Sequence, residues 1–122
     1  SADEIDSIGI VASTKQAMLR AVAELDPQPN HLIIDALQLP AVSISQTSIV
    51  KADSRSQSVA AASIIAKVTR DKLMAEVFEH EYPGYGFASH KGYGTKTHML
   101  ALKELGASPI HRQSFKPIRD LL

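Results

Sequence analysis

The chain has 122 residues, no cysteine, 44% hydrophobic and 21% charged residues, and a formal net charge of zero. This length allows one domain with a modest core, and the composition excludes wholesale disorder, a disulfide framework and a thiolate metal site. No apolar run reaches the length of a membrane span, so we expect no membrane partner, and a reducing cytoplasm is the expected location.

The charges are unevenly distributed along the chain. Residues 1–30 contain two Lys or Arg and five Asp or Glu, whereas residues 90–122 contain six and two. A cationic C-terminal third suits phosphate binding, with acidic residues further back available for metal ions. A chance imbalance on a solvated surface explains the charges equally well when they are taken alone.

The N-terminal region is predicted to be helical. Apolar residues recur at helical intervals over about residues 2–25, a stretch that Gly9 is able to break. Ser1 and Glu4 have the spacing of a capping box, which indicates that the helix begins at the first residues. A polar, proline-containing turn over residues 26–30 ends it.

Acidic residues end the two predicted strands. The apolar run His31–Asp35 predicts a buried strand, and residues 47–52 repeat the pattern and run into Asp53. Ligands of open α/β sheets bind beyond the carboxyl ends of strands, so the side chains of Asp35 and Asp53 are expected to converge. Two close carboxylates need a cation between them, and Mg²⁺ suits such a place. The alternative for each acid alone is an ordinary strand-ending or capping role.

Residues 57–81 are predicted to form a long helix, which the Tyr82-Pro83-Gly84 segment ends. Small and aliphatic residues dominate its first half, which predicts that most of it is buried against a close neighbour. Ser63, Lys67 and Asp71 recur at i, i+4 and i+8 and form one polar stripe. Either this stripe faces solvent with Lys67 and Asp71 paired, or it faces a cleft with Lys67 for a phosphate and Asp71 near a metal.

The C-terminal third combines a glycine-rich loop with basic residues. Residues 83–94 hold four glycines and predict a structured loop, followed by a helix over 95–105 with Gly106 as its C-cap. Tyr93 lies between two glycines, where its ring either stacks on a sugar or base or plugs the loop onto the core. The basic run 111–117 either binds phosphates or covers a surface, and it leads into a final short helix.

In their order and spacing these segments resemble ribonuclease HII over essentially the whole chain. The resemblance is carried by Glu4-Ile5-Asp6, Leu32–Asp35, Val50–Asp53, Ala61–Ile64, Lys67–Asp71, Tyr82–Phe87, His90–Thr95 and His111–Phe115. It implies an α/β, RNase H-like fold, in which helices flank a mixed sheet and C-terminal helices follow. It also implies two-metal hydrolysis, with Mg²⁺ or Mn²⁺, of the phosphodiester 5′ to ribonucleotides embedded in DNA or in RNA–DNA hybrids, as in ribonucleotide excision repair.

The resemblance also implies roles for single residues. Asp35 and Asp53 match two of the family's four catalytic, metal-binding carboxylates, and Asp71 matches a further acid near the metals. Tyr93 matches the tyrosine that packs against the sugars at the RNA–DNA junction. The other candidate nucleic-acid-binding residues are Ser63, Lys67, His111, Arg112 and Ser114.

The chain departs from the family pattern in two respects. The family usually has Gly after its third carboxylate and before its fourth, where this chain has Ala36 and Ala52. The family also begins with a strand that bears an adjacent Asp-Glu pair and a Gly-Arg-Gly run, which no segment here matches. We therefore expect residues 1–122 to form the C-terminal part of one catalytic domain, with an incomplete fold.

Such a fragment is expected to be inactive alone and prone to self-association. Two further alternatives remain at this point. One is a non-catalytic nucleic-acid-binding module, and the other is a structural piece that binds neither metal nor nucleic acid.

Overall fold

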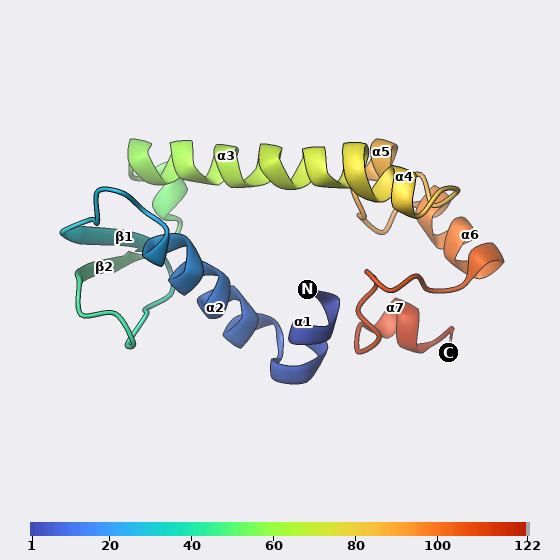
Figure 1. Ribbon diagram of the computed structural model, residues 1–122, viewed down its shortest axis with the longest axis horizontal. Coiled ribbons are helices and arrows are strands. Elements are labelled where there is room, and N and C mark those ends of the chain that lie inside the picture. The colour runs from blue at the N-terminus through green and yellow to red at the C-terminus, as the bar shows by residue number, and fades with distance from the viewer. Residues whose placement is uncertain (122) are drawn as a thin grey trace. The chain divides into compact units, whose positions relative to one another are not determined.

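The computed structural model describes residues 1–121, which form two compact units (Figure 1). The C-terminal unit combines Ser1–Ser7 with Ala66–Leu122, and the central unit spans Ile8–Ile65. Leu122, the last residue of the predicted domain, lies outside the described residues. The organisation of residues 1–122 as part of one catalytic domain stays a prediction.

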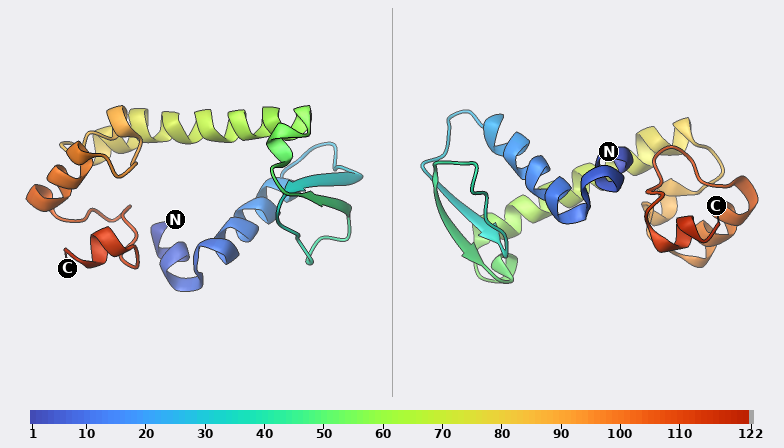
Figure 2. Two further views of the ribbon diagram at one scale, coloured as in Figure 1. Left: turned by 180° about the vertical axis from the view of Figure 1, so that it is seen from behind. Right: turned by 90° about the horizontal axis from the view of Figure 1, so that it is seen from below.

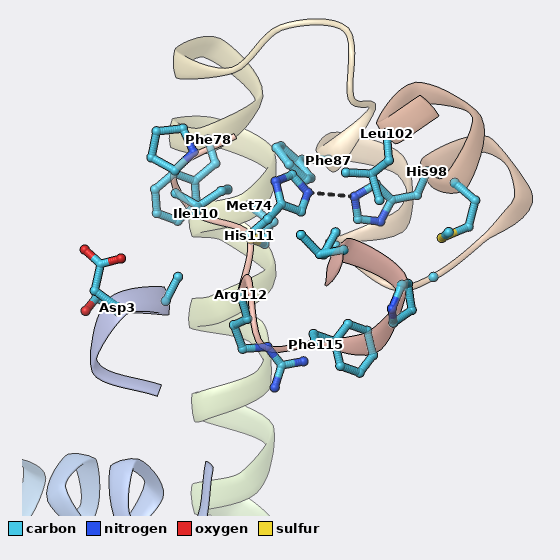
Figure 3. A pocket seen from close by; sticks show the side chains of 18 of the residues that line it. Asp3, Met74, Phe78, Phe87, His98, Leu102, Ile110, His111, Arg112 and Phe115 are labelled. Atoms are coloured by element: carbon cyan, nitrogen blue, oxygen red, sulfur yellow. Dashed lines mark hydrogen bonds between the residues drawn. The ribbon is translucent and has the colours of Figure 1, made fainter. Parts of the chain in front are cut away.

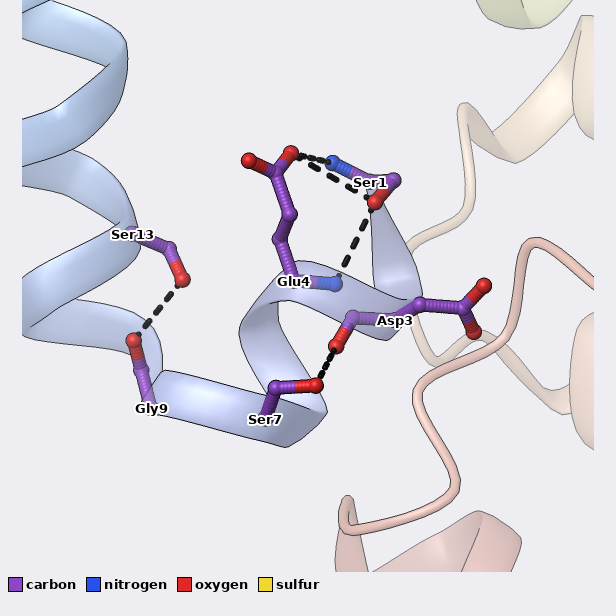
Figure 4. Close-up of polar contacts among 6 residues, drawn as sticks. All are labelled: Ser1, Asp3, Glu4, Ser7, Gly9 and Ser13. Carbon is purple, nitrogen blue, oxygen red and sulfur yellow. Dashed lines mark hydrogen bonds and ion pairs between the residues drawn. The ribbon is translucent and has the colours of Figure 1, made fainter.

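The first two helices confirm the predicted N-terminal helix and its break. Helix α1 spans Ala2–Ile8 and helix α2 spans Ile10–Ala23, with Gly9 between them at φ 80°. Ser1 Oγ accepts a hydrogen bond from the Glu4 amide at 3.2 Å, and the Glu4 carboxylate accepts one from the Ser1 backbone nitrogen at 3.1 Å (Figure 4). This is the predicted capping box, which satisfies N–H groups that have no partner within the helix.

The central unit contains two parallel strands, drawn side by side in Figure 2. Strand β1 spans His31–Asp35 and strand β2 spans Ser45–Ile49. The prediction of a strand at His31–Asp35 is confirmed, but its expected burial was wrong, because Leu32 is the one buried residue of β1 and Ile33 is 43% exposed. In the segment between the strands, Leu39 is only 1% exposed, and the Gln46 side chain accepts a hydrogen bond from its N–H at 2.9 Å and donates one to its C=O at 2.8 Å. Helices combined with a small parallel sheet confirm the α/β class and are consistent with an incomplete RNase H-like fold.

The predicted boundaries of the second strand were wrong. Strand β2 ends at Ile49, and the 3₁₀ helix η1, Ala52–Ser54, follows. The cause is Lys51, which adopts a left-handed conformation at φ 56° that an extended strand does not tolerate. Asp53 therefore lies in a tight turn beyond the strand and does not close it.

The predicted long helix is present but lies more open than expected. It consists of α3 (Gln57–Lys72), a π-helical segment η2 (Leu73–Phe78) and α4 (Glu79–Glu81). The sequence did not predict the π-helical segment. The expected burial of the first half was wrong, because no residue of α3 is buried and Ile64 and Ile65 are 62% and 67% exposed.

The remaining helices belong to the C-terminal unit. A one-turn helix, α5 (Phe87–His90), lies inside the predicted glycine-rich loop, which the sequence had not indicated. Helix α6 (Lys96–Leu105) begins and ends as predicted: Thr95 Oγ1 accepts from the His98 amide at 3.3 Å, and Gly106 is the C-cap. The last helix, α7, spans Lys116–Arg119 and confirms the expected final turn.

Aromatic and aliphatic side chains form the core of the C-terminal unit. Phe87 lies at its centre, 1% exposed and stacked on Tyr85 with ring centroids 5.3 Å apart. The buried members of the cluster are Met74, Tyr85, Phe87, Leu102 and Ile118. This core holds the glycine-rich loop against helix α6 and the segment η2.

Helix α1 is attached to this unit through one carboxylate. Asp6 accepts hydrogen bonds from the Gln113 amide at 2.7 Å, the Ser114 amide at 3.2 Å and the Ser114 hydroxyl at 2.5 Å. The bond from the Ser114 hydroxyl, more than any other contact, holds the pKa of Asp6 below its ordinary value. Asp6 therefore fixes the segment that carries the predicted basic run.

None of the helices within residues 1–121 combines the length and the apolar character that a membrane crossing requires.

Ala36 occupies a position that suits glycine, because its φ is 54° while its N–H donates to the Ile49 carbonyl at 3.1 Å. A left-handed conformation destabilises the folded state by roughly 1–2 kcal/mol when the residue has a Cβ, and glycine avoids this strain. Glycine also loses more conformational entropy on folding, which offsets part of the gain. We expect Ala36→Gly to raise the free energy of unfolding by roughly 0.5–1 kcal/mol.

Urea denaturation of the 122-residue chain measures this effect. Ala41→Gly is the matched control in the same unit, since Ala41 does not have a positive φ, and this variant should be no more stable than the wild type. An Ala36→Gly variant that is destabilised as much as Ala41→Gly would show that the turn carries no strain.

Candidate functional site

The segments that carry two of the candidate acids come together at one end of the small sheet. Asp35 is the last residue of β1 and pairs in register with Ile49, the last residue of β2. Because the strands are parallel, both carboxyl ends lie at the same edge. The Asp35 Oδ1 atom accepts a hydrogen bond of 3.2 Å from the amide of Ala52, the residue before Asp53. The structure therefore brings together the two segments that carry Asp35 and Asp53.

The turn that presents Asp53 is tightly fixed. Ala52 is 0% exposed, so its methyl group fills the space beneath the turn, and Ser54 Oγ donates to the Lys51 carbonyl at 2.9 Å. The Asp53 side chain is exposed above this fixed backbone. Ala52, where the resembled family usually has Gly, thus packs without a positive φ, and its N–H reaches Asp35.

The chemistry of Asp35 and Asp53 fits a divalent cation. Both offer hard oxygen ligands at exposed positions on neighbouring elements. Within residues 1–121 no group of three or more His, Cys, Asp or Glu side chains is gathered as a complete metal cage. Mg²⁺ commonly binds through one or two carboxylates and takes its other ligands from water and phosphate. The pair therefore fits a cation that is shared with a phosphate.

Asp71, the third candidate acid, is engaged within the C-terminal unit. Its Oδ2 atom pairs with Lys67 Nζ at 2.5 Å, and its Oδ1 atom lies 3.9 Å from Arg70 Nη1. The hydrogen bond between the two groups lowers the pKa of Asp71 and raises that of Lys67. Pairing was the simpler of the two alternatives for this stripe, and a metal-binding role of Asp71 stays a prediction.

The Oδ1 atom of Asp71 is buried without a hydrogen-bond partner among the described residues. A buried carboxylate oxygen in this state keeps an unused acceptor, which a cation or a donor group would satisfy. Ser63, the first member of the stripe, belongs to the central unit, and its hydroxyl donates to the Ala60 carbonyl at 2.8 Å.

Tyr93 presents its ring to solvent. The residue is 59% exposed, which is not the position of a side chain that plugs a loop onto the core. The guanidinium of Arg70 lies 5.4 Å from the ring centroid, within the range of a cation–π contact. The sequence had not singled out Arg70, although it lies within a segment that carried the resemblance. The exposed ring can stack on a sugar or a base.

The three candidates of the basic run differ in what they already bind. Ser114 donates its hydroxyl to Asp6, and both ring nitrogens of His111 make hydrogen bonds inside the unit. Arg112 lies over the Phe115 ring, 4.7 Å from its centroid, and its N–H groups make no hydrogen bond among the described residues. Among these three candidates, Arg112 is therefore the one with side-chain donors available for a phosphate. Nucleic-acid contacts by all three stay predictions.

Three histidines pack around Phe87, at ring-centroid distances of 5.6–5.9 Å. His90 and His98 are buried and stacked, with centroids 4.3 Å apart. His98 Nε2 lies 3.1 Å from His111 Nε2, and Figure 3 shows these two rings facing each other. A cavity of about 530 Å³, lined mainly by apolar side chains, adjoins both His98 and His111. The sequence had not indicated roles for His90 and His98.

Burial lowers the pKa values of both His98 and His111, and the mutual proximity of the histidines lowers them further. The folded state therefore holds both rings neutral at pH values where an unfolded histidine, with a pKa of about 6.5, takes up a proton. Below about pH 6.5 the unfolded state therefore binds more protons than the folded state. The free energy of unfolding is highest above this pH, and it decreases as the pH falls towards the folded-state pKa values of His98 and His111.

We expect the C-terminal unit to unfold at lower urea concentration at pH 5.5 than at pH 7.5, and His111→Asn to weaken this pH dependence. His80→Asn removes an exposed histidine of the same unit and serves as the control. In this range Asp6 and Asp71, whose pKa values are lowered, stay ionised. Equal stability at the two pH values would contradict the expectation.

A family model described as Ribonuclease HII matches residues 1–118 of the 122-residue chain. The matched range contains all the candidate metal-binding and nucleic-acid-binding residues and extends over both compact units.

Proposed function

Because the chain belongs to the ribonuclease HII family, whose activity is ribonuclease H type hydrolysis of RNA paired with DNA, we propose a specific reaction for it. This reaction is hydrolysis of the phosphodiester on the 5′ side of ribonucleotides embedded in DNA or in RNA–DNA hybrids. The observation that carries the proposal is the hydrogen bond from the Ala52 amide to Asp35, which joins the Asp35 and Asp53 segments at the carboxyl edge of the sheet.

In this proposal Asp35 and Asp53 of the central unit hold divalent cations, and Asp71 of the C-terminal unit is proposed separately as a metal-binding residue. The family generally depends on divalent metals, and Mg²⁺ or Mn²⁺ matches the oxygen ligands offered here. A bound cation would supply a polarised phosphate and a water of lowered pKa. The protein's own contribution is to fix the two carboxylates through the turn at Ala52–Ser54 and to leave them exposed to a phosphate backbone.

The nucleic acid is proposed to bind the C-terminal unit through Tyr93 and the basic residues around it. Arg70 beside the ring, and Arg112 with its available donors, supply positive charge for phosphates. The further contacts proposed on this unit are Lys67, His111 and Ser114. Ser63, which belongs to the central unit, is proposed as a nucleic-acid contact by itself. Ribonucleotide excision repair in the cytoplasm, by one catalytic domain of which residues 1–122 are the C-terminal part, is the proposed setting.

We expect Tyr93→Ala to weaken binding of a duplex that contains one ribonucleotide by roughly 1–3 kcal/mol, or about 5–150-fold, because a stacking surface is lost. Fluorescence anisotropy with a labelled duplex and the 122-residue chain measures the effect. Tyr93→Phe is the matched control, since it keeps the ring and removes the hydroxyl. A Tyr93→Ala chain that binds as the wild type does would remove Tyr93 from the proposed interface.

The duplex titration and a separate Mn²⁺ titration together separate the alternatives. A chain that binds the duplex but binds no Mn²⁺ would point to a non-catalytic nucleic-acid-binding module, and binding of neither would point to a structural piece. Cleavage by the purified chain, with Mg²⁺ or Mn²⁺ present, tests the expectation that it is inactive alone. Self-association is measured on the same sample by sedimentation.

A further inference from the structure

We propose that His98 is a positioning residue for Tyr93. A chain of hydrogen bonds runs from Ser108 through His111 and His98 to the Tyr93 carbonyl, and it holds the loop backbone while the Tyr93 ring stays exposed. The inference rests on the proposed contact between Tyr93 and nucleic acid.

The hydrogen bonds determine which ring nitrogen carries each proton. The Ser108 amide donates to His111 Nδ1 at 3.0 Å, so that nitrogen has no proton. The neutral ring then has its proton on Nε2, which donates to His98 Nε2 at 3.1 Å. His98 Nε2 is consequently an acceptor, which leaves its proton on Nδ1, and this N–H donates to the Tyr93 carbonyl at 3.0 Å. Each member thus fixes the tautomer of the next.

The other backbone group of Tyr93 is held by His90. The Tyr93 N–H donates to the His90 carbonyl at 2.9 Å. The His90 ring is itself fixed: the Gly92 amide donates to its Nδ1 at 3.2 Å, and its Nε2–H donates to the Tyr85 carbonyl at 2.8 Å. Since the His90 and His98 rings are stacked, both polar groups of the Tyr93 backbone connect to one buried aromatic pair.

Solvent exposure distinguishes Tyr93, the proposed nucleic-acid contact, from the buried histidines that hold its backbone. His98 is 5% exposed and His90 is 7% exposed, whereas Tyr93 is 59% exposed. Gly92, at φ 79°, gives the backbone the turn that carries the ring outward. A side chain held in its binding geometry beforehand loses less entropy when it binds, so the support raises affinity without touching the ligand.

The protonation pattern is tested directly on the unmodified 122-residue chain. Long-range ¹H–¹⁵N NMR spectra at pH 7.5 distinguish histidine Nδ1–H from Nε2–H. We expect Nδ1–H for His98 and Nε2–H for His111 and His90. An Nε2–H tautomer at His98 would overturn the inference, because that ring could not donate to the Tyr93 carbonyl.

A matched pair of variants tests the link to binding. The amide nitrogen of Asn lies near the place of histidine Nδ1, so His98→Asn keeps a donor for the Tyr93 carbonyl and loses the contact with His111. The amide group of Gln lies near the place of Nε2, so His98→Gln keeps the contact with His111 and loses the donor. We expect His98→Gln to bind the single-ribonucleotide duplex about fivefold more weakly, as the loss of one hydrogen bond implies, and His98→Asn to bind within about twofold of the wild type.

Hydrogen exchange at the Tyr93 and Thr95 amides should follow the same order, faster in His98→Gln than in His98→Asn. A merely structural role of His98 would instead lower stability and binding equally in both variants, and equal binding by the two would overturn the inference. The Tyr93→Ala chain separates the contact made by Tyr93 from its positioning by His98. If Tyr93→Ala weakens binding while His98→Gln does not, Tyr93 remains a nucleic-acid contact and the positioning role of His98 fails. If Tyr93→Ala binds as the wild type does, the Tyr93 contact and the positioning role of His98 fail together.

Discussion

Asp53→Asn should lower metal-dependent cleavage by about 100-fold or more in a cleavage-competent protein that contains this chain. Loss of a residue that only hydrogen-bonds to a metal ligand typically costs about 10–100-fold, and loss of a direct ligand should cost more. The carboxylate would hold a cation against the phosphate charge, and a neutral amide is a much weaker ligand for Mg²⁺. Binding of the duplex should stay near the wild-type level or strengthen slightly, because one negative charge near the DNA backbone is removed.

Two measurements test this expectation. Cleavage of a labelled duplex with one ribonucleotide, in Mg²⁺ and in Mn²⁺, gives the loss of activity, and Mn²⁺-induced broadening of NMR signals in the 122-residue chain gives the loss of metal binding. Asp26→Asn removes an exposed carboxylate of the same unit and is the matched control. Near-normal cleavage by Asp53→Asn would reduce Asp53 to an ordinary turn residue and remove the anchor of the proposed site.

Phe87→Ala should lower the free energy of unfolding of the C-terminal unit by about 3–5 kcal/mol. The ring is 1% exposed, stacks on Tyr85 and touches His90, His98 and His111 at their edges or faces. Truncation removes buried apolar surface and leaves a cavity that a cluster of rings fills poorly. Because whole domains are stable by only about 5–15 kcal/mol, a change of this size can unfold the unit.

Urea denaturation and hydrogen exchange measure the loss. Phe87→Leu, which keeps most of the buried volume, should cost less than half as much as Phe87→Ala. We also expect the histidine NMR signals to lose their distinct tautomers in Phe87→Ala, since the rings pack on this side chain. A Phe87→Ala chain as stable as Phe87→Leu would show that Phe87 does not organise the unit.

Much of the local structure follows from short-range chemistry that is written in the sequence. The capping box at Ser1, the break at Gly9 and the helix between Thr95 and Gly106 each depend on groups within about four residues of one another. Strand β1 was predicted for the same reason, from one apolar run bounded by turn residues. The family resemblance was also legible, because it depends on motifs and their order, and the family match over residues 1–118 confirms it.

Expectations failed where a conformation or a neighbour outside the local pattern decides. Lys51 ended β2 early by adopting a left-handed conformation that is unusual for lysine, and so placed Asp53 in a turn. The aliphatic composition of α3 predicted burial, but its residues are not buried. Apolar composition shows that burial would be energetically favourable, and it does not determine whether another element packs against the helix.

The features that shape the proposed site were decided by tertiary structure alone. The Asp35 carboxylate reaches the amide of a residue 17 positions later, and Asp6 binds Gln113 and Ser114, more than 100 positions away. Helical or strand periodicity carries no information about such pairs, because it describes only residues within one helix or strand. The sequence by itself determined which residues are available for metal and nucleic-acid chemistry. Only the packing around Phe87 decided that buried histidines hold the Tyr93 backbone while the ring stays in solvent.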